Sequence, residues 1–186
     1  MEPDARSEPF WYRVAAVRIS DYDPAWPQRY AAESARITEV LTPRLVAIEH
    51  VGSTAVPGMA AKPIIDMLVA VPTYDDFPDV VRRLHRIGYR YTPESETSDP
   101  DRRVFRKGPD DITRMRSHHL HLTAEGSRYW RRLIAFRDHL RRHPAEADAY
   151  VRLKRALAAR YADDSARYTD GKHGFVVAAQ RQAGVD

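Results

Sequence analysis

One stretch constrains the fold more than any other part of the chain: residues 48–71, IEHVGSTAVPGMAAKPIIDMLVAV. Its apolar, β-favouring ends predict two buried strands, at about 45–51 and 64–71. Between them, Gly52 and Ser53 break the first strand and predict a tight turn that opens a short helix. Pro57 fits the first turn of that helix, where a residue without an N–H is tolerated. The stretch is therefore predicted to form strand, turn, short helix and strand.

The second of these strands carries an acid, Asp66. A carboxylate inside a buried strand is costly unless it faces a cation or hydrogen-bond donors. A Gly-Ser turn at a helix start presents backbone N–H groups to an anion, and an adjoining carboxylate can hold Mg²⁺ against it. The alternative is an ordinary turn between two core strands, with Asp66 paired to a lysine. The turn, Lys62 and Asp66 occur together, which favours a phosphate-and-metal site.

The same stretch carries a family resemblance. His50 to Asp66, HVGSTAVPGMAAKPIID, resembles the signature of the GrpB family almost letter for letter. That family resembles the nucleotidyltransferase superfamily, in which a Gly-Ser turn precedes a metal-binding acid on the next strand. The resemblance also implies kinship with the domain fused to dephospho-CoA kinase in some bacteria.

Length and composition set broad limits. A chain of 186 residues suggests one domain spanning 1–186, with residues 1–8 expected to be flexible. The absence of cysteine excludes disulfides, thiolate zinc sites and a nucleophilic cysteine, and it suits a reducing cytoplasm. No apolar run reaches the roughly 20 residues of a membrane helix, and the acidic N-terminus is unlike a signal peptide. We therefore expect a cytoplasmic protein with no membrane partner.

A basic segment lies in the second half of the chain. Six Arg or Lys residues fall between Arg102 and Arg116, a concentration that a phosphate site needs, although a solvated hairpin is the alternative. Strand alternation then places His119 and His121 on one face. Such a pair can ligate a metal, bind phosphate or act as acid and base, or it can be an ordinary pair of core histidines. Arg116 to His121 also resembles the family's second signature.

From residue 124 onward the pattern predicts helices. Ser127 caps the first and Pro144 starts the second. The last helix has Tyr168 and Lys172 four apart on one face, with Lys172 able to reach a phosphate and Tyr168 a base. An anchoring helix with one exposed lysine is the alternative. Gly171 weakens this helix and leaves its register open, although the segment resembles the family's closing motif.

Together these features predict an α+β fold: a mixed sheet with helices on one face and a C-terminal helical layer. The resemblance implies a nucleotidyltransferase-like sheet with Asp66, His119 and His121 on neighbouring strands facing a common cleft. The spacing alone does not say that those strands are neighbours.

The first functional hypothesis is a metal-dependent nucleotidyltransferase that moves a nucleotidyl group from a nucleoside triphosphate, or uses another phosphorylated small molecule, with Mg²⁺ or Mn²⁺. Its residues fall into three overlapping sets. They are, for nucleotide or phosphate binding, His50, Gly52, Ser53, Lys62, Arg103, Arg116, Tyr168 and Lys172; for catalysis, Asp66, His119 and His121; and for the metal, Asp66 and His121.

One departure from the superfamily keeps a second hypothesis open. Active members usually carry a second acid two residues after the first, where this chain has Leu68, and a third acid on a neighbouring strand, where it has His121. One carboxylate is thin support for two hard cations. The alternative is a non-catalytic accessory domain that binds a nucleotide or a coenzyme A precursor. A nucleic-acid-binding hairpin at Arg102–Arg116 is disfavoured, because 30 basic and 26 acidic residues leave only a +4 excess.

Overall fold

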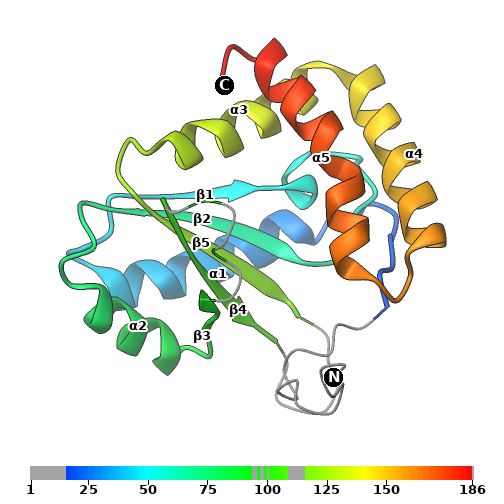
Figure 1. Cartoon of the computed structure of the whole chain (residues 1–186). Helices are drawn as coiled ribbons and strands as arrows, with labels where there is room; N and C mark the ends of the chain where they lie inside the picture. The colour runs from blue at the N-terminus through cyan, green and yellow to red at the C-terminus, as the bar shows by residue number, and fades with distance from the viewer. Residues whose placement is uncertain (1–15, 94–95, 97–98, 100, 109–115, 186) are drawn as a thin grey trace, which may run out of the picture.

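The computed structural model describes residues 16–93, 96, 99, 101–108 and 116–185. The segment expected to be flexible, residues 1–8, and Arg114 of the basic segment lie outside these ranges. The strands and helices lie as shown in Figure 1. They are β1 (Ala47–Val51), β2 (Ile65–Val71), β3 (Arg90–Tyr91), β4 (Arg102–Lys107), β5 (His118–Ala124), α1 (Trp26–Leu41), the 3₁₀ turn η2 (Ser53–Ala55), α2 (Phe77–Arg86), α3 (Arg128–Arg142), α4 (Pro144–Arg160) and α5 (Ser165–Gln182).

The described strands form a five-stranded mixed sheet in the order β1-β2-β5-β4-β3. β2 and β5 are parallel, whereas the pairs β1/β2, β4/β5 and β3/β4 are antiparallel. The parallel pair lies near the middle of the sheet and aligns Asp66 with His119. Strands from distant parts of the chain therefore become neighbours, as the family resemblance implies.

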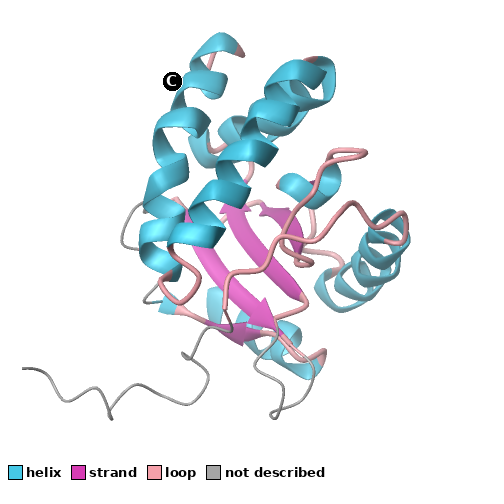
Figure 2. Ribbon diagram, turned by 90° about the vertical axis from the view of Figure 1, so that its right-hand side faces the viewer, coloured by secondary structure: helices cyan, strands magenta, loops and turns pink. Residues whose placement is uncertain are grey.

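Helices cover the two faces of the sheet in different ways (Figure 2). On one face, α1 and α2 enclose the main core, whose central members are Ile37, Leu41, Met67, Val69, Leu84, Phe105, Leu120 and Leu122. On the other face, Val51 and Leu68 pack against Tyr129 of α3. α3, α4 and α5 form a second core among themselves. The α+β class, the mixed sheet and the C-terminal helical layer are thus confirmed.

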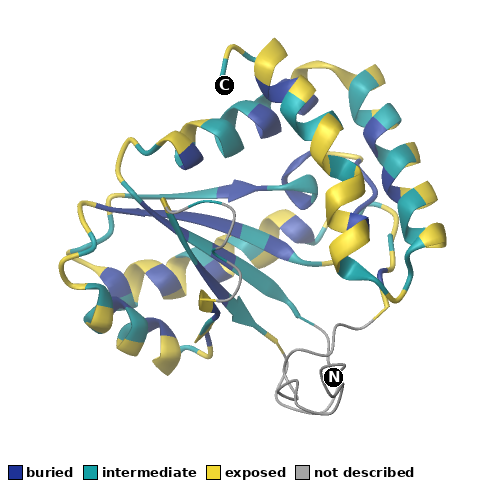
Figure 3. Cartoon of the chain, in the orientation of Figure 1, coloured by how far each residue is buried: buried dark blue, intermediate teal, exposed yellow. Residues whose placement is uncertain are grey.

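The C-terminal helices begin and continue for local reasons. The Ser127 hydroxyl accepts a hydrogen bond from the Trp130 amide at 3.1 Å, which confirms its role as the cap of α3. α4 begins at Pro144, also as predicted. α5 runs unbroken through Gly171, where a side chain would collide with Leu157 of α4, so glycine here allows the two helices to pack closely. Burial follows this packing, with the outer sides of α4 and α5 exposed (Figure 3).

The turn after β1 differs from the prediction. The expected short helix is a single 3₁₀ turn of three residues, η2, and Pro57 lies beyond its end. Gly52, which precedes η2, has φ +70°. So short a turn has no substantial helix dipole, and any anion bound beside it must be held mainly by side chains.

None of the helices in the described ranges combines the length and the hydropathy needed to cross a membrane.

A buried ion pair joins the first helix to the sheet. Lys107 Nζ on β4 donates to both carboxylate oxygens of Glu33 on α1, at 2.7 and 3.0 Å. Glu33 is only 5% exposed, so its charge depends on this partner. Removing one member of such a pair leaves the other charged and poorly solvated.

We therefore expect Lys107→Met to lower the free energy of unfolding by about 3 kcal/mol, because Glu33 loses its counter-charge. The matched control is Lys172→Met in the C-terminal layer, which leaves this pair intact. The exposed Glu39→Ala on the same helix is expected to change stability by less than about 0.5 kcal/mol. Urea unfolding of the three variants is the measurement, and equal losses in Lys107→Met and Glu39→Ala would show that the pair contributes little.

Candidate functional site

The site is centred on Asp66, near the start of β2. In the parallel register Asp66 is paired with His119, and His121 lies two residues farther along the same face of β5. Asp66 Oδ1 is 3.4 Å from His119 Nδ1 and 3.7 Å from His121 Nε2. The three side chains are 27%, 19% and 16% exposed, so water reaches them. The predicted convergence of one acid and two imidazoles is present.

Gly52 closes one side of this group. A Cβ built on Gly52 would overlap Asp66 Oδ2, and the backbone there has φ +70°. Glycine is required at this position for two reasons: the left-handed backbone and the close approach of the carboxylate. The signature glycine thus leaves room for the acid fourteen residues later in the sequence.

Two lysines from separate elements lie over one buried tyrosine. Lys172 Nζ is 4.4 Å and Lys62 Nζ is 5.4 Å from the centre of the Tyr168 ring. Tyr168 is 1% exposed, so it offers no open face for stacking a base. Its role is to hold the two ammonium groups through cation–π contacts, which corrects the expectation that it reads the base.

Burial and neighbouring charges shift the pKa values of these groups. Burial alone raises the pKa of Asp66, but the facing nitrogens of His119 and His121 outweigh it and bring the pKa well below its usual range. Burial lowers the pKa of His119 to about 4, against the opposing effect of Asp66. Burial, with the Lys62 charge, lowers the pKa of Lys172 to about 8, and burial lowers the pKa of Lys62 as well. At neutral pH the site therefore holds a carboxylate, a neutral His119 and charged lysines.

Tyr129 orients His121 from the side facing α3. The Tyr129 hydroxyl accepts a hydrogen bond from Arg102 Nη1 at 3.1 Å and lies 3.1 Å from His121 Nδ1. Because the hydroxyl already accepts from Arg102, its own proton is available for His121 Nδ1. In that tautomer His121 turns an Nε2–H toward Asp66, and metal binding at Nε2 requires the other tautomer.

Sequence reasoning missed Arg102, and it also missed Lys154. The Lys154 ammonium, 2% exposed, donates to the Ala60 carbonyl at 2.6 Å, and burial lowers its pKa to about 7. Lys172 adds to this shift by charge repulsion, which indicates that the two lysines are close. The sequence did offer a signal for Lys154: it lies four residues after Tyr150, and the two therefore share the buried face of α4.

Arg103 lies on the wrong face of the sheet for the predicted role. Its guanidinium carbon is 4.8 Å from the Tyr74 ring and 5.8 Å from the Phe77 ring, on the side covered by α2. Strand alternation instead puts Arg102 and Arg106, paired with Thr123 and His119, on the face of Asp66. The basic strand is present as predicted, but Arg103 lies on the face of the sheet opposite Asp66.

Arg116 and Ser53 retain their predicted positions near the site. The charges of Arg116 and Arg106 both act on Lys62. Ser53 opens η2 directly after Gly52. Their roles as phosphate ligands remain predictions.

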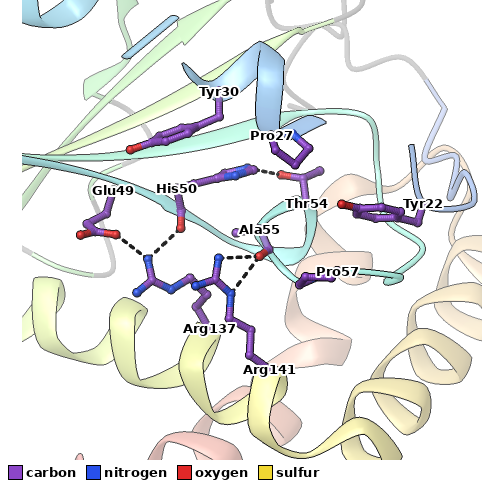
Figure 4. Close-up of a pocket in the computed structure, with 10 residues that line it drawn as sticks. All are labelled: Tyr22, Pro27, Tyr30, Glu49, His50, Thr54, Ala55, Pro57, Arg137 and Arg141. Atoms are coloured by element: carbon purple, nitrogen blue, oxygen red, sulfur yellow. Dashed lines mark hydrogen bonds and ion pairs between the residues drawn. The ribbon is translucent and has the colours of Figure 1, made fainter. Parts of the chain in front are cut away.

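His50 does not join the group. Its ring stacks on Tyr30 at 4.7 Å, and its Nε2 lies 3.0 Å from the Thr54 hydroxyl (Figure 4). Burial lowers its pKa to about 4. It lines a separate cavity of about 280 Å³ together with Arg137 and Arg141. His50 therefore fastens β1 to α1 and η2, and the phosphate role expected for it is not supported.

The donor set decides which cation suits Asp66. Mg²⁺ is usually held by one or two carboxylates together with substrate phosphates, which Asp66 alone can satisfy. The nitrogen of His119 that faces Asp66 is Nδ1, and that of His121 is Nε2. Asp66 therefore fits a divalent cation shared with a phosphorylated ligand.

This chain belongs to the GrpB family. The family described as GrpB protein matches residues 16–182. A UPF0157 protein of Pseudomonas aeruginosa is 42% identical over 162 residues, covering 86% of this chain and 64% of that protein. The chain covers only 48% of a second relative, the UPF0157 protein YqkA of Bacillus subtilis. It thus spans less than two thirds of the length of these two relatives.

Structural and more distant relatives extend the comparison. The crystal structure of GrpB from Enterococcus faecalis matches with a TM-score of 0.79 and 35% identity, over 89% of this chain and 96% of that one. A dephospho-CoA kinase of Mycobacterium tuberculosis is 24% identical over 206 residues, 51% of its length. The Cid1 poly(U) polymerase bound to MgATP matches with a TM-score of 0.42 and 11% identity, over 74% of this chain and 45% of that one. That last likeness is too distant to bear on function.

The contact between Gly52 and Asp66 leads to a prediction that compares two glycine substitutions. Gly52→Ala and Gly58→Ala both place alanine at positive φ, +70° and +75°, but a side chain at Gly58 meets nothing within 4 Å. Gly58→Ala should therefore cost about 1–2 kcal/mol from the backbone alone. Gly52→Ala should cost at least about 1 kcal/mol more, because Asp66 must move and because the Gly52 backbone, with ψ −172°, is one that alanine rarely adopts. Urea unfolding compares the two, and equal costs would contradict the close approach.

Proposed function

We propose that this chain binds the phosphate chain of a nucleoside triphosphate at the Asp66 site and transfers its nucleotidyl group to an acceptor. The observation that carries the proposal is a water-accessible carboxylate beside two lysines whose pKa values are lowered by burial. Lysines in this state lack enough counter-charge, and a bound polyphosphate supplies it. Gly52 makes room for the Asp66 carboxylate, since a side chain there would overlap Oδ2.

The proposed role of each residue follows from its charge. Lys62 and Lys172 hold phosphate oxygens and offset the charge that develops when the acceptor attacks the α-phosphorus and pyrophosphate leaves. Asp66 holds the divalent cation, which supplies charge neutralisation and orients the phosphates when bound. His119, with a pKa of about 4, is a poor proton carrier at neutral pH. It is better suited to be a hydrogen-bond partner or ligand than a general base.

A second candidate function rests on Leu68. This residue is 0% exposed and packs with Val51 and Tyr129, where active nucleotidyltransferases are expected to carry a second acid. With Asp66 as its carboxylate, the site is also suited to binding a phosphorylated ligand without transferring a nucleotidyl group. The second candidate is an accessory domain that holds a nucleotide or a coenzyme A precursor.

Turnover separates the two candidates. We expect pyrophosphate release from a nucleoside triphosphate with Mn²⁺ and a panel of acceptors, and a loss of at least about 100-fold in Asp66→Asn, because the cation loses its anchor. Asp148→Asn, which removes an exposed carboxylate on α4, is the matched control and should keep full activity. Nucleotide binding without turnover dependent on Asp66 would favour the accessory domain, and absence of binding of both nucleotides and coenzyme A precursors would overturn both candidates.

The lowered pKa of Lys172 makes binding depend on pH. Lys172 is protonated below its pKa of about 8, so its attraction for phosphate is present at lower pH and lost as pH rises through that value. ATP, whose phosphates are ionised well below this range, should bind roughly tenfold more weakly at about pH 9.5 than at about pH 7.5.

Lys172→Arg tests this assignment, because arginine stays charged throughout the range. We expect the pH dependence to flatten in this variant, whereas Lys172→Met should bind weakly at every pH. Isothermal titration calorimetry at a series of pH values gives both profiles. An unchanged pH profile in Lys172→Arg would assign the titration to another group.

A further inference from the structure

A second cluster of metal-ligating side chains lies where α3, α4 and the end of α5 meet, outside the Asp66 site. It consists of His139 near the end of α3, His143 at the junction with α4, and Glu146 in the first turn of α4. Each offers one ligand atom, and these atoms all lie within 4.8 Å of one another. His139 is 3% exposed, while His143 is exposed and gives solvent access to the cluster.

A fourth side chain points at the same place from α5. One heteroatom of the Gln182 amide lies 3.2 Å from His139 Nε2, and 3.2 and 3.1 Å from Glu146 Oε1 and Oε2. His139 Nε2 is itself 2.9 Å from Glu146 Oε2. These separations approach the roughly 3.3 Å between ligand atoms in a tetrahedral site with zinc bonds of about 2.0 Å.

The Gln182 amide has two orientations in this cluster. With its NH2 group turned toward His139 and Glu146, it donates to them, and protons alone satisfy the cluster. With its oxygen turned toward them, the Gln182 oxygen, the Glu146 carboxylate and an unprotonated His139 Nε2 all present lone pairs to one place. A divalent cation there favours the second orientation, because each atom then presents a lone pair to the same positive charge.

His143 is already held as a ligand would be. Its Nδ1 lies 2.8 Å from the His139 backbone carbonyl, so Nδ1 carries the proton and donates it. The lone pair is therefore on Nε2, the atom left for a metal. A ring nitrogen hydrogen-bonded to a backbone carbonyl in this way is the usual support for a metal-binding histidine.

We propose that His139, His143, Glu146 and Gln182 bind a divalent transition-metal ion of the zinc class. Two imidazoles, a carboxylate and an amide oxygen suit Zn²⁺ better than Mg²⁺ or Ca²⁺. The stacked rings of His139 and His143, with centroids 4.1 Å apart, must rotate slightly so that both point at the ion. The bound ion joins α3, α4 and α5 and stabilises the helical layer.

The test is a Zn²⁺ titration of untagged, metal-free full-length chain with a competing chelator dye. We expect one Zn²⁺ per chain at this site, with affinity falling at least about tenfold in His143→Ala and in Glu146→Gln. His85→Ala, which removes an exposed histidine on α2, is the matched control and should bind as the parent does. Asp66→Asn should also keep the site, which separates it from any ion held by Asp66.

Two further readouts decide the outcome. Zn²⁺ should raise the melting temperature of the parent and of His85→Ala, but not of His143→Ala, since only an ion bound to the folded state stabilises it. Anomalous scattering from a zinc-soaked crystal should place the ion between His139 and Glu146. The proposal is overturned if the parent binds no Zn²⁺, if His143→Ala and Glu146→Gln bind it unchanged, or if the ion lies elsewhere.

Discussion

The parallel pairing of β2 with β5 is the constraint on which the rest of the site depends. It sets Asp66 beside His119 and brings His121 within 3.7 Å of the same carboxylate oxygen. A carboxylate in that position needs space above it, which only glycine at position 52 leaves. It also needs positive charge nearby, which comes from Lys62 and from α5. One requirement thus links Gly52, Asp66 and α5: the carboxylate needs both space and nearby positive charge.

Positive charge exceeds negative charge around Asp66, and this excess favours an anionic ligand. Lys62 and Lys172 share the Tyr168 ring, and each feels the charge of the other or of nearby arginines. Asp66 is the acid among the described residues whose charge opposes this crowding at both lysines. One carboxylate does not neutralise the group, so an anion that enters is stabilised by charges already in place. That preorganisation is what a binding site for phosphates requires.

Much of this arrangement was predictable from the sequence, and the remainder was not for identifiable reasons. The motif around Asp66, the paired histidines and the Ser127 cap follow from local patterns. Arg103 was misassigned because alternation says which residues share a face, but not which face meets the site. His50 was misassigned because it stacks on Tyr30, a residue twenty positions earlier on another element. Lys154 was missed because a lysine in a helix usually reaches water, and only tertiary packing buries it.

The position of Lys172 depends on how firmly α5 is held along its length. Gly171 lets α5 lie against Leu157 of α4, one residue before Lys172. Farther along, Arg132 of α3 donates to the Gln180 side-chain oxygen at 3.2 Å, and the Gln180 amide returns a bond to the Arg132 carbonyl. Gln182 lies ten residues, or about 15 Å, beyond Lys172 on the same rigid helix. Because a helix transmits displacement along its axis, contacts at this far end help to fix where the Lys172 ammonium lies in the field of Asp66.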